Sequence, residues 1–228
     1  MKTSKNLTII IPTRNEEESL GKLLKKFRKF KNFYKEIIVV DGKSKDRTRK
    51  IAKFYNCKVI KQKTLGYGSA IIQGVRKTNT KYFIIFDGDG SKDPIYLKRF
   101  ANKMRNEKNG IIFAERYGVN AGSLDDTLLT YIGNRIFTIL GKFFFSLKLN
   151  DILHTFFLCE TKIFKKLKFK YNDFVFCVEF PILAKRNKIK SSFIPTIEKK
   201  RYDGVPKVRS FSDGFKILVG MVKLYIFN

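Results

Sequence analysis

The chain has 228 residues, 43% of them apolar, which is enough to bury one hydrophobic core and excludes an intrinsically disordered protein. Its three cysteines are far apart, which excludes a disulfide framework or a Cys-x-x-Cys zinc site and indicates a reducing, cytoplasmic environment. With 48 basic against 20 acidic residues, the net charge of +28 leaves four explanations open: general lysine enrichment, nucleic acid, an anionic membrane surface, or phosphorylated small molecules.

Up to about residue 115, apolar strands alternate with amphipathic helices. This is the α/β pattern of a mostly parallel central sheet flanked by helices. We predict strands over residues 7–11, 37–40, 58–61, 82–86 and 111–114. We predict four helices in this region. Asn15 caps the first, Ser44 or Asp46 caps the second, the third spans 69–77, and the fourth begins at Asp93 and Pro94. Ligands are expected at the carboxyl edge of such a sheet.

The second half of the chain has a different pattern of predicted elements. We expect a polar loop over 118–126, a long helix to about residue 146, and a mixture of helices and strands after it. Two apolar stretches interrupted by lysines, 136–149 and 211–227, are typical of helices that lie in a membrane interface or pack on a core. No apolar run is long enough to span a membrane, and the first residues do not resemble a signal peptide. We predict one domain over 1–210 and an amphipathic C-terminal helix over 211–228.

Acidic residues stand where predicted strands end. Asp41 ends the second strand, and Asp87-Gly88-Asp89 follows the fourth. Two carboxylates at positions i and i+2 suit Mg²⁺, which typically combines one or two carboxylates with substrate phosphate oxygens. A metal-bound diphosphate is therefore the ligand that we expect, and an Asp-Gly turn without a ligand is the alternative.

Two groups of segments carry a family resemblance. IIIPTRNEEESL, EIIVVDGKSKDRT, GYGSAIIQGV and YFIIFDGDGSKDP are similar, in order and spacing, to the nucleotide-sugar half of family 2 glycosyltransferases, which have the GT-A fold. FAERYG, LNDILHTFF and KKRYDGVPKVRSFSDGFKIL resemble their polyprenyl (dolichyl) phosphate sugar transferases, the dolichol-phosphate mannose synthase group. The resemblance covers nearly the whole chain. It implies transfer of a hexose from a nucleoside-diphosphate sugar to a polyprenyl or dolichyl phosphate.

The resemblance also implies roles for individual residues. Asp87 and Asp89 match the Asp-x-Asp pair that binds Mg²⁺ or Mn²⁺ and the sugar diphosphate. The implied nucleotide-sugar site consists of Pro12, Arg14, Glu16, Asp41, Asp87, Gly88, Asp89 and Ser91. The implied acceptor-phosphate site consists of Arg116, Arg135, Arg201 and Lys207. Asp87, Asp89, Arg116, Asp151 and Arg201 are the candidate catalytic residues, with Asp151 orienting the acceptor, lying beside the metal or capping a turn.

This sequence departs from the family pattern at several of these positions. Arg14 stands where the family often has an aromatic residue, and Gly42 and Lys43 replace acidic residues that often follow Asp41. Thr155 occupies a glycine position before Phe156. The shapes of the nucleoside pocket and of the acceptor loop are therefore expected to differ from those of the family.

The chemistry of the acceptor decides which catalytic groups are needed. A phosphate monoester has its second pKa near about 6, so it is largely dianionic at neutral pH and can attack the anomeric carbon without a general base. We therefore expect single displacement with inversion, and we expect the one histidine, His154, to be structural.

Other interpretations remain open at this point. The same fold could transfer a sugar to a saccharide acceptor, and 23 Phe and 10 Tyr residues in a basic chain could instead serve a nucleic-acid-binding module. No nucleic-acid motif is present, so nucleic acid is not the expected partner. The expected location is the cytosolic face of an anionic membrane, peripherally bound. The sequence does not decide between GDP-mannose, UDP-glucose and UDP-N-acetylhexosamine as the donor, and it does not indicate the oligomeric state.

Overall fold

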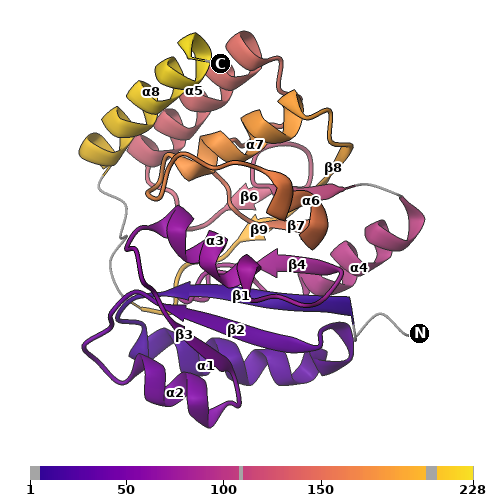
Figure 1. The fold of residues 1–228 in the computed structure, drawn as a ribbon, viewed down its shortest axis with the longest axis vertical. Helices are drawn as coiled ribbons and strands as arrows, with labels where there is room; N and C mark the ends of the chain where they lie inside the picture. The colour runs from indigo at the N-terminus through magenta and orange to yellow at the C-terminus, as the bar shows by residue number, and fades with distance from the viewer. Residues whose placement is uncertain (1–5, 108–109, 204–209, 228) are drawn as a thin grey trace.

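The structure is a computed structural model that describes residues 6–107, 110–203 and 210–227 (Figure 1). The strands are β1 (Leu7–Thr13), β2 (Glu36–Asp41), β3 (Lys58–Lys61), β4 (Tyr82–Ile85), β5 (Ile111–Glu115), β6 (Gly122–Ser123), β7 (Phe157–Glu160), β8 (Ser191–Pro195) and β9 (Ile197–Glu198). The helices are α1 (Glu17–Phe27), α2 (Thr48–Phe54), α3 (Tyr67–Arg76), α4 (Tyr96–Asn106), α5 (Leu128–Phe145), α6 (Thr161–Lys166), α7 (Phe176–Arg186) and α8 (Ser210–Ile226), and a 3₁₀ helix, η2 (Arg28–Phe33), follows α1. The five predicted strands are confirmed within two residues at each end.

Seven strands form the main sheet in the order β3-β2-β1-β4-β7-β5-β8, and β6 pairs with β9 in a small second sheet. Every pairing in the main sheet is parallel except those of β7, which runs antiparallel between β4 and β5. Because β7 runs in the opposite direction, it begins at the edge where β1, β2, β4 and β5 end. The segment before β7, residues 151–156, therefore lies at the carboxyl edge of the parallel strands.

Side chains alternate between the two faces of the sheet, as strand geometry requires. Ile9 and Ile11 of β1 face α1, α2 and α4 in one hydrophobic cluster. Ile10 faces α3, α6 and α7 in a second cluster. The helices thus cover both faces, and the polar groups of the strand ends are left at the edge.

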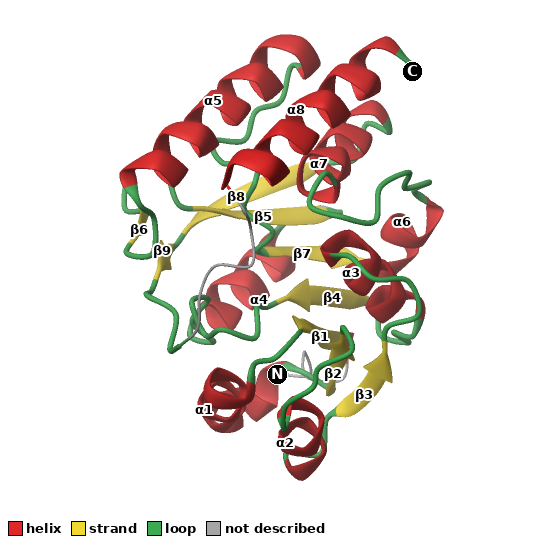
Figure 2. Cartoon of the chain, turned by 90° about the vertical axis from the view of Figure 1, so that its left-hand side faces the viewer, coloured by secondary structure: helices red, strands yellow, loops and turns green. Residues whose placement is uncertain are grey.

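A third hydrophobic cluster lies outside the sheet, between α7 and the pair α5 and α8. Figure 2 shows α5 and α8 side by side as an outer layer over α7. The α8 residues in this cluster are Ile217, Met221 and Leu224, which recur at helical spacing. Both lysine-interrupted apolar stretches therefore pack on a core along one side. In the described part of the chain, no helix combines the length and the apolar character needed to cross a bilayer.

Three predicted helix caps are wrong in position, since Asp93 also lies three residues before the first residue of α4. Asn15 has a φ of 54° and lies two residues before α1, whose N-cap is Glu16. The side chain of Asn15 instead accepts a hydrogen bond from the backbone N–H of Lys45 at 2.9 Å. Asp46 precedes α2 by two residues and accepts the Thr48 N–H at 3.0 Å. The side chain of Asn15 thus ties the loop after β1 to the loop after β2.

Candidate active site

The ends of β1, β2 and β4 lie next to one another, because β1 pairs with β2 on one side and with β4 on the other. Thr13 is in register with Asp41, so the loop over 12–16 runs beside the end of β2. A Cβ atom at Gly88 would lie 2.9 Å from Thr13 and 3.1 Å from Glu16, so only glycine fits there without displacement. The structure thus brings the Asp-Gly-Asp turn against the loop that follows β1.

The predicted nucleoside residues differ in accessibility. Pro12 is half-buried and Arg14 is exposed, whereas Glu16 is buried and accepts a hydrogen bond from the Ser19 hydroxyl at 2.9 Å. Asp41 is fully buried at the end of β2, 3.8 Å from the guanidinium of Arg49. The carboxylate of Asp41 is therefore fixed in orientation, and its contact with a nucleobase stays a prediction.

Asp87 and Asp89 both remain partly accessible, with side chains 27% and 18% exposed. The backbone N–H of the buried Ser91 donates to an oxygen of Asp89 at 3.0 Å. Burial, and secondly the charge of Asp87, raise the pKa of Asp89 to about 6. The pair is a concentration of negative charge that a cation would stabilise.

The two carboxylates fit a hard divalent cation. Among the described residues there is no cluster of three or more His, Cys, Asp or Glu side chains that could hold a metal by itself. Both side chains nevertheless keep some exposed surface, and Mg²⁺ is typically bound by one or two carboxylates when substrate phosphates complete its shell. Asp87 and Asp89 would be the protein ligands of such a cation.

Arg116 follows β5 and lies in a buried acidic cluster. Its Nε and one terminal nitrogen donate to the two oxygens of Asp151 at 2.7 Å and 3.1 Å. Its other terminal nitrogen donates to Glu198 at 3.0 Å and lies 3.8 Å from Asp126. These carboxylates raise the pKa of Arg116 well above its ordinary value despite burial. Arg116 is neutralised inside the protein, and its contact with the acceptor phosphate stays a prediction.

Asp151 precedes β7 and is the most deeply buried member of this cluster, since its side chain has no exposed surface. Both of its oxygens accept hydrogen bonds from Arg116. The three roles expected for Asp151 stay predictions, and the structure shows a contact with Arg116.

The segment 199–202 runs along the Asp-Gly-Asp turn. The N–H of Tyr202 donates to the Asp89 carbonyl at 2.8 Å, and the N–H of Lys199 donates to the Ser91 carbonyl at 2.9 Å. Arg201 pairs with Asp125, and its guanidinium lies 3.8 Å from Asp89. Arg201 is thus placed beside the predicted diphosphate site. Lys207 lies outside the described residues, and its predicted role is untested.

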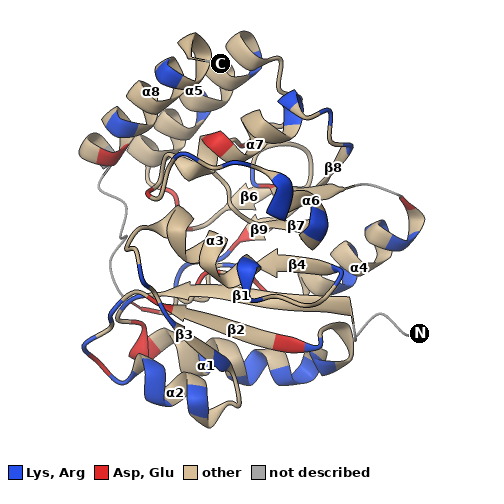
Figure 3. Ribbon diagram, viewed as in Figure 1, with Lys and Arg blue, Asp and Glu red and all other residues tan. Residues whose placement is uncertain are grey.

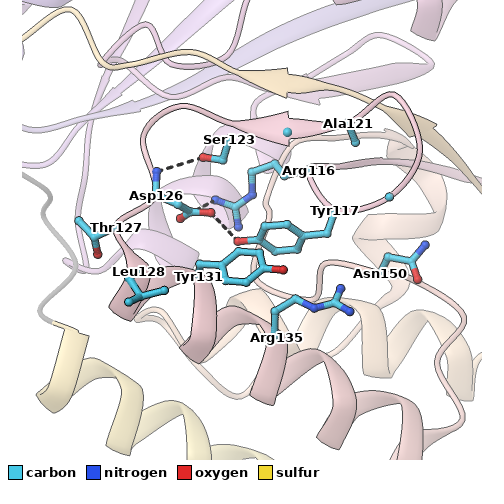
Figure 4. A pocket seen from close by; sticks show the side chains of 12 residues that line it. Arg116, Tyr117, Ala121, Ser123, Asp126, Thr127, Leu128, Tyr131, Arg135 and Asn150 are labelled. Atoms are coloured by element: carbon cyan, nitrogen blue, oxygen red, sulfur yellow. Dashed lines mark hydrogen bonds and ion pairs between the residues drawn. The ribbon is translucent and has the colours of Figure 1, made fainter.

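A cleft of about 730 Å³ lies between the end of β5 and the N-terminal half of α5 (Figure 4). Tyr117 lies between Arg116 and Arg135, with its ring centroid 5.3 Å and 5.7 Å from the two guanidinium carbons. Leu128 and Tyr131, both exposed, also line the cleft. Arg135 makes no ion pair with any described carboxylate, and the carboxylate Asp126 on the same cleft lies beside Arg116 instead.

His154 is buried beside this region, and its ring meets Phe156 edge-on at 5.9 Å. Burial, and then the charges of Arg116 and Lys92, lower the pKa of His154 well below its ordinary value. The ring is therefore neutral at physiological pH. No described hydrogen-bond partner reaches its Nε2 atom. The structural role of His154 stays a prediction.

Sequence reasoning missed several residues of the site. Lys92 pairs with Asp87 at 2.7 Å, and the Tyr67 hydroxyl donates to the same carboxylate at 2.8 Å. Lys92 follows the Asp-x-Asp pair so closely that it could have been noticed. Asp125 and Glu198 come from elements whose meeting no local pattern predicts.

Comparison with known proteins places the chain in a family. Residues 8–168 match the glycosyl transferase family 2 domain. The chain belongs to glycosyl transferase family 2. The match includes the ends of β1, β2 and β4 as well as Arg116, Arg135 and Asp151, but it stops before Arg201.

Two curated relatives of this chain come from Haloferax volcanii. Glycosyltransferase AglJ is 24% identical over 205 residues, which are 90% of this chain and 66% of AglJ. A dolichyl-phosphate hexose transferase is 28% identical over 149 residues, which are 65% of this chain and 64% of that protein. The matched regions thus span slightly less than two thirds of the length of either relative.

A solved structure shows the same fold. The glucosyl-3-phosphoglycerate synthase of Mycobacterium tuberculosis, in complex with Mn²⁺, UDP and glucosyl-3-phosphoglycerate, superposes with a TM-score of 0.77 at 12% identity. The match covers 97% of this chain and 80% of that chain. This family 2 chain therefore has the GT-A fold, as the sequence predicted.

Proposed function

We propose that this family 2 member transfers a hexose from a nucleoside-diphosphate sugar to polyprenyl or dolichyl phosphate. We further propose that it works at the cytosolic face of a membrane, to which it binds peripherally. The donor is of the GDP-mannose or UDP-glucose type. The name of the Haloferax volcanii dolichyl-phosphate hexose transferase supports the acceptor class, and the Mn²⁺ and UDP in the mycobacterial synthase structure support the donor class and the metal.

The donor site in this proposal is the edge formed by β1, β2 and β4. The loop over 12–16 and Asp41 would hold the nucleoside, and Asp87 with Asp89 would hold Mg²⁺ or Mn²⁺ on the diphosphate. Arg201 lies 3.8 Å from Asp89, where it can stabilise negative charge on the departing nucleoside diphosphate.

The observation that carries the acceptor proposal is the composition of the cleft. Its wall combines the cation Arg135 with exposed Leu128 and Tyr131 at the start of α5. An acceptor with an anionic head and an apolar tail satisfies both kinds of group at once. A saccharide can stack on Tyr131, but it carries neither the full negative charge that would pair with Arg135 nor an alkyl chain to cover Leu128.

The apolar side of the cleft continues into a larger surface. We call it the α5–α8 apolar face: Leu128, Ile132, Ile136, Ile139 and Phe143 of α5 with Phe211, Phe215, Leu218, Val222 and Tyr225 of α8. These side chains are 41–80% exposed, and within each helix they recur at three- and four-residue spacing. Ring contact between Phe144 and Tyr225 at 5.2 Å joins the two helices.

The charge around this face suits an anionic bilayer. Lys142, Lys216 and Lys223 are exposed on the same two helices, which otherwise carry few charges (Figure 3). Aliphatic and aromatic side chains on one side with lysines beside them are typical of helices that lie in a membrane interface. Each lysine near anionic lipid adds on the order of 1 kcal/mol to binding. A bilayer on this face would also present the polyprenyl chain to the cleft.

In the chemical step, the main contribution of the protein is to position the donor and the acceptor. An oxygen of the acceptor phosphate dianion forms a bond to the anomeric carbon while the bond from that carbon to the diphosphate oxygen breaks. The electron pair leaves with the nucleoside diphosphate, whose charge a divalent cation would neutralise. Neutral His154 and the paired Asp151 take no proton. The anomeric configuration inverts because there is one displacement.

The donor half of this proposal can be tested by thermal melting. GDP or UDP should raise the melting temperature only with Mn²⁺ or Mg²⁺ present, and oligonucleotides should not raise it. Asp89→Asn should abolish the metal-dependent shift, and Glu18→Gln, which removes the charge of an exposed acid on α1, should preserve it. Protection by nucleotide that is unaffected by metal or by Asp89→Asn would contradict the assignment of the metal site.

A further inference from the structure

Lys92 is a buried cation inside the predicted donor site. Its side chain is 1% exposed, and its Nζ lies 2.7 Å from Oδ2 of Asp87. The Thr155 hydroxyl lies 3.5 Å from the same nitrogen, and the ring of Phe156 faces it at 5.7 Å. Lysine is almost never buried to this extent without an anionic partner, and Asp87 is that partner.

Asp87 is held from two sides. Tyr67 at the start of α3 donates its hydroxyl hydrogen to Oδ1 of Asp87 at 2.8 Å, while Lys92 holds Oδ2. The Tyr67 hydroxyl is also 2.5 Å from Thr155, and its ring stacks on Phe174 with centroids 5.2 Å apart. Tyr67 and Lys92 thus fix this carboxylate before any ligand binds, and Thr155 contacts both of them.

This arrangement changes the charge that a metal ion would meet. Asp87 and Asp89 are two residues apart, and without a counter-ion their negative charges would repel each other. Lys92 compensates Asp87 in the metal-free protein. The surrounding side chains enclose its ammonium group, so it cannot swing away when a cation approaches. A free divalent ion at this pair is therefore opposed by a fixed positive charge.

We propose that Lys92 is a built-in counter-ion that positions Asp87 and keeps the affinity of the site for free divalent metal low. The metal then binds tightly only together with a nucleoside diphosphate, whose negative charges offset the ammonium group. The site would bind divalent metal weakly in the absence of a nucleoside diphosphate, and would bind it tightly together with the donor. This inference rests on the proposed function, because it takes Asp87 and Asp89 as the metal ligands.

Free Mn²⁺ measured by electron paramagnetic resonance tests the inference without any turnover. Lys92→Met removes the charge and keeps the length of the side chain, and Lys92→Gln is a second neutral variant. Lys98→Met removes the same charge from an exposed position on α4 and serves as the control. Circular dichroism would establish that each variant is folded.

Without nucleotide, either neutral variant at position 92 should bind Mn²⁺ about tenfold more tightly than the wild type, because one unit charge close to the metal has been removed. The Lys98→Met protein should match the wild type. GDP or UDP should increase the Mn²⁺ affinity of the wild type much more than that of the Lys92 variants.

The outcomes separate this inference from the proposal on which it rests. Equal or weaker Mn²⁺ binding by both folded Lys92 variants, in a wild type that does bind Mn²⁺ with nucleotide, overturns the counter-ion role alone. Absence of Mn²⁺ binding in every protein, with and without nucleotide, overturns the metal site and the counter-ion role together.

Discussion

Arg116 and Asp151 form a two-point ion pair at 2.7 Å and 3.1 Å in the interior of the protein, beneath the cleft at the end of β5. The pair joins the strand that precedes the cleft to the segment that precedes β7. Glu198 and Asp126 add negative charge on the other side of the same guanidinium. This cluster fixes the floor of the cleft.

Removing the charge of Asp151 should destabilise the protein. We expect Asp151→Asn to lower the free energy of unfolding by about 3 kcal/mol, because a buried arginine loses its principal partner. Urea denaturation measures this change. Glu18→Gln, the loss of an exposed acid on α1, should change stability by less than about 0.5 kcal/mol. Equal stability of the two variants would show that the pair does not hold the cleft.

His154 should make the protein less stable in mild acid. Its pKa in the folded state is well below 6.5, so below pH 6.5 the unfolded chain binds a proton that the folded chain does not. Stability should therefore fall with decreasing pH, by about 1.4 kcal/mol between pH 7.5 and 5.5 from this group.

Two measurements check this pH dependence. The difference between the wild type and His154→Gln isolates the histidine from other titrating groups, and the slope should be smaller in the variant. Because the chain has one histidine, a single imidazole proton resonance can be followed by NMR, and it should not titrate while the protein is folded. A resonance that titrates near pH 6.5 would contradict the buried, neutral ring.

The α5–α8 apolar face should bind lipid. Replacing Phe143 and Phe215, which are 79% and 68% exposed, by serine should weaken binding to phosphatidylcholine–phosphatidylserine vesicles by about tenfold or more, since two apolar side chains no longer enter the interface. Sedimentation with vesicles measures the binding. Phe54→Ser, at a residue 75% exposed on α2, is the matched control and should leave vesicle binding unchanged. Loss of binding in the control as well would place the contact elsewhere.

Arg135 should contribute to binding of the acceptor and not to binding of the donor. Arg135→Gln should raise the KM for polyprenyl phosphate by about tenfold, the loss of one charge-assisted hydrogen bond, and leave the KM for the nucleotide sugar unchanged. Arg76→Gln, at an exposed position of α3, is the control. A rise in the donor KM instead would reassign the cleft to the nucleotide sugar.

The sequence predicted those features of the site that depend on order along the chain. Strand periodicity located β1 to β5, and the acids at strand ends located the Asp-Gly-Asp turn. No local sequence pattern predicts that antiparallel β7 inserts between β4 and β5. This insertion brings Thr155 close to Lys92. The ion pair of Arg116 with Glu198, 82 positions further along the chain, could not be predicted either. Pairings across such separations depend on the packed fold.

The proposed transfer of a hexose to polyprenyl phosphate is tested most directly by a transfer assay. The assay combines the purified chain, labelled nucleotide sugars, Mn²⁺ and either a polyprenyl phosphate or free saccharides as acceptor. We expect that label from one donor class passes to the lipid phosphate, that the product has the inverted anomeric configuration, and that Asp89→Asn abolishes the transfer. Transfer to saccharides alone, or retention of configuration in the lipid product, would contradict this proposal.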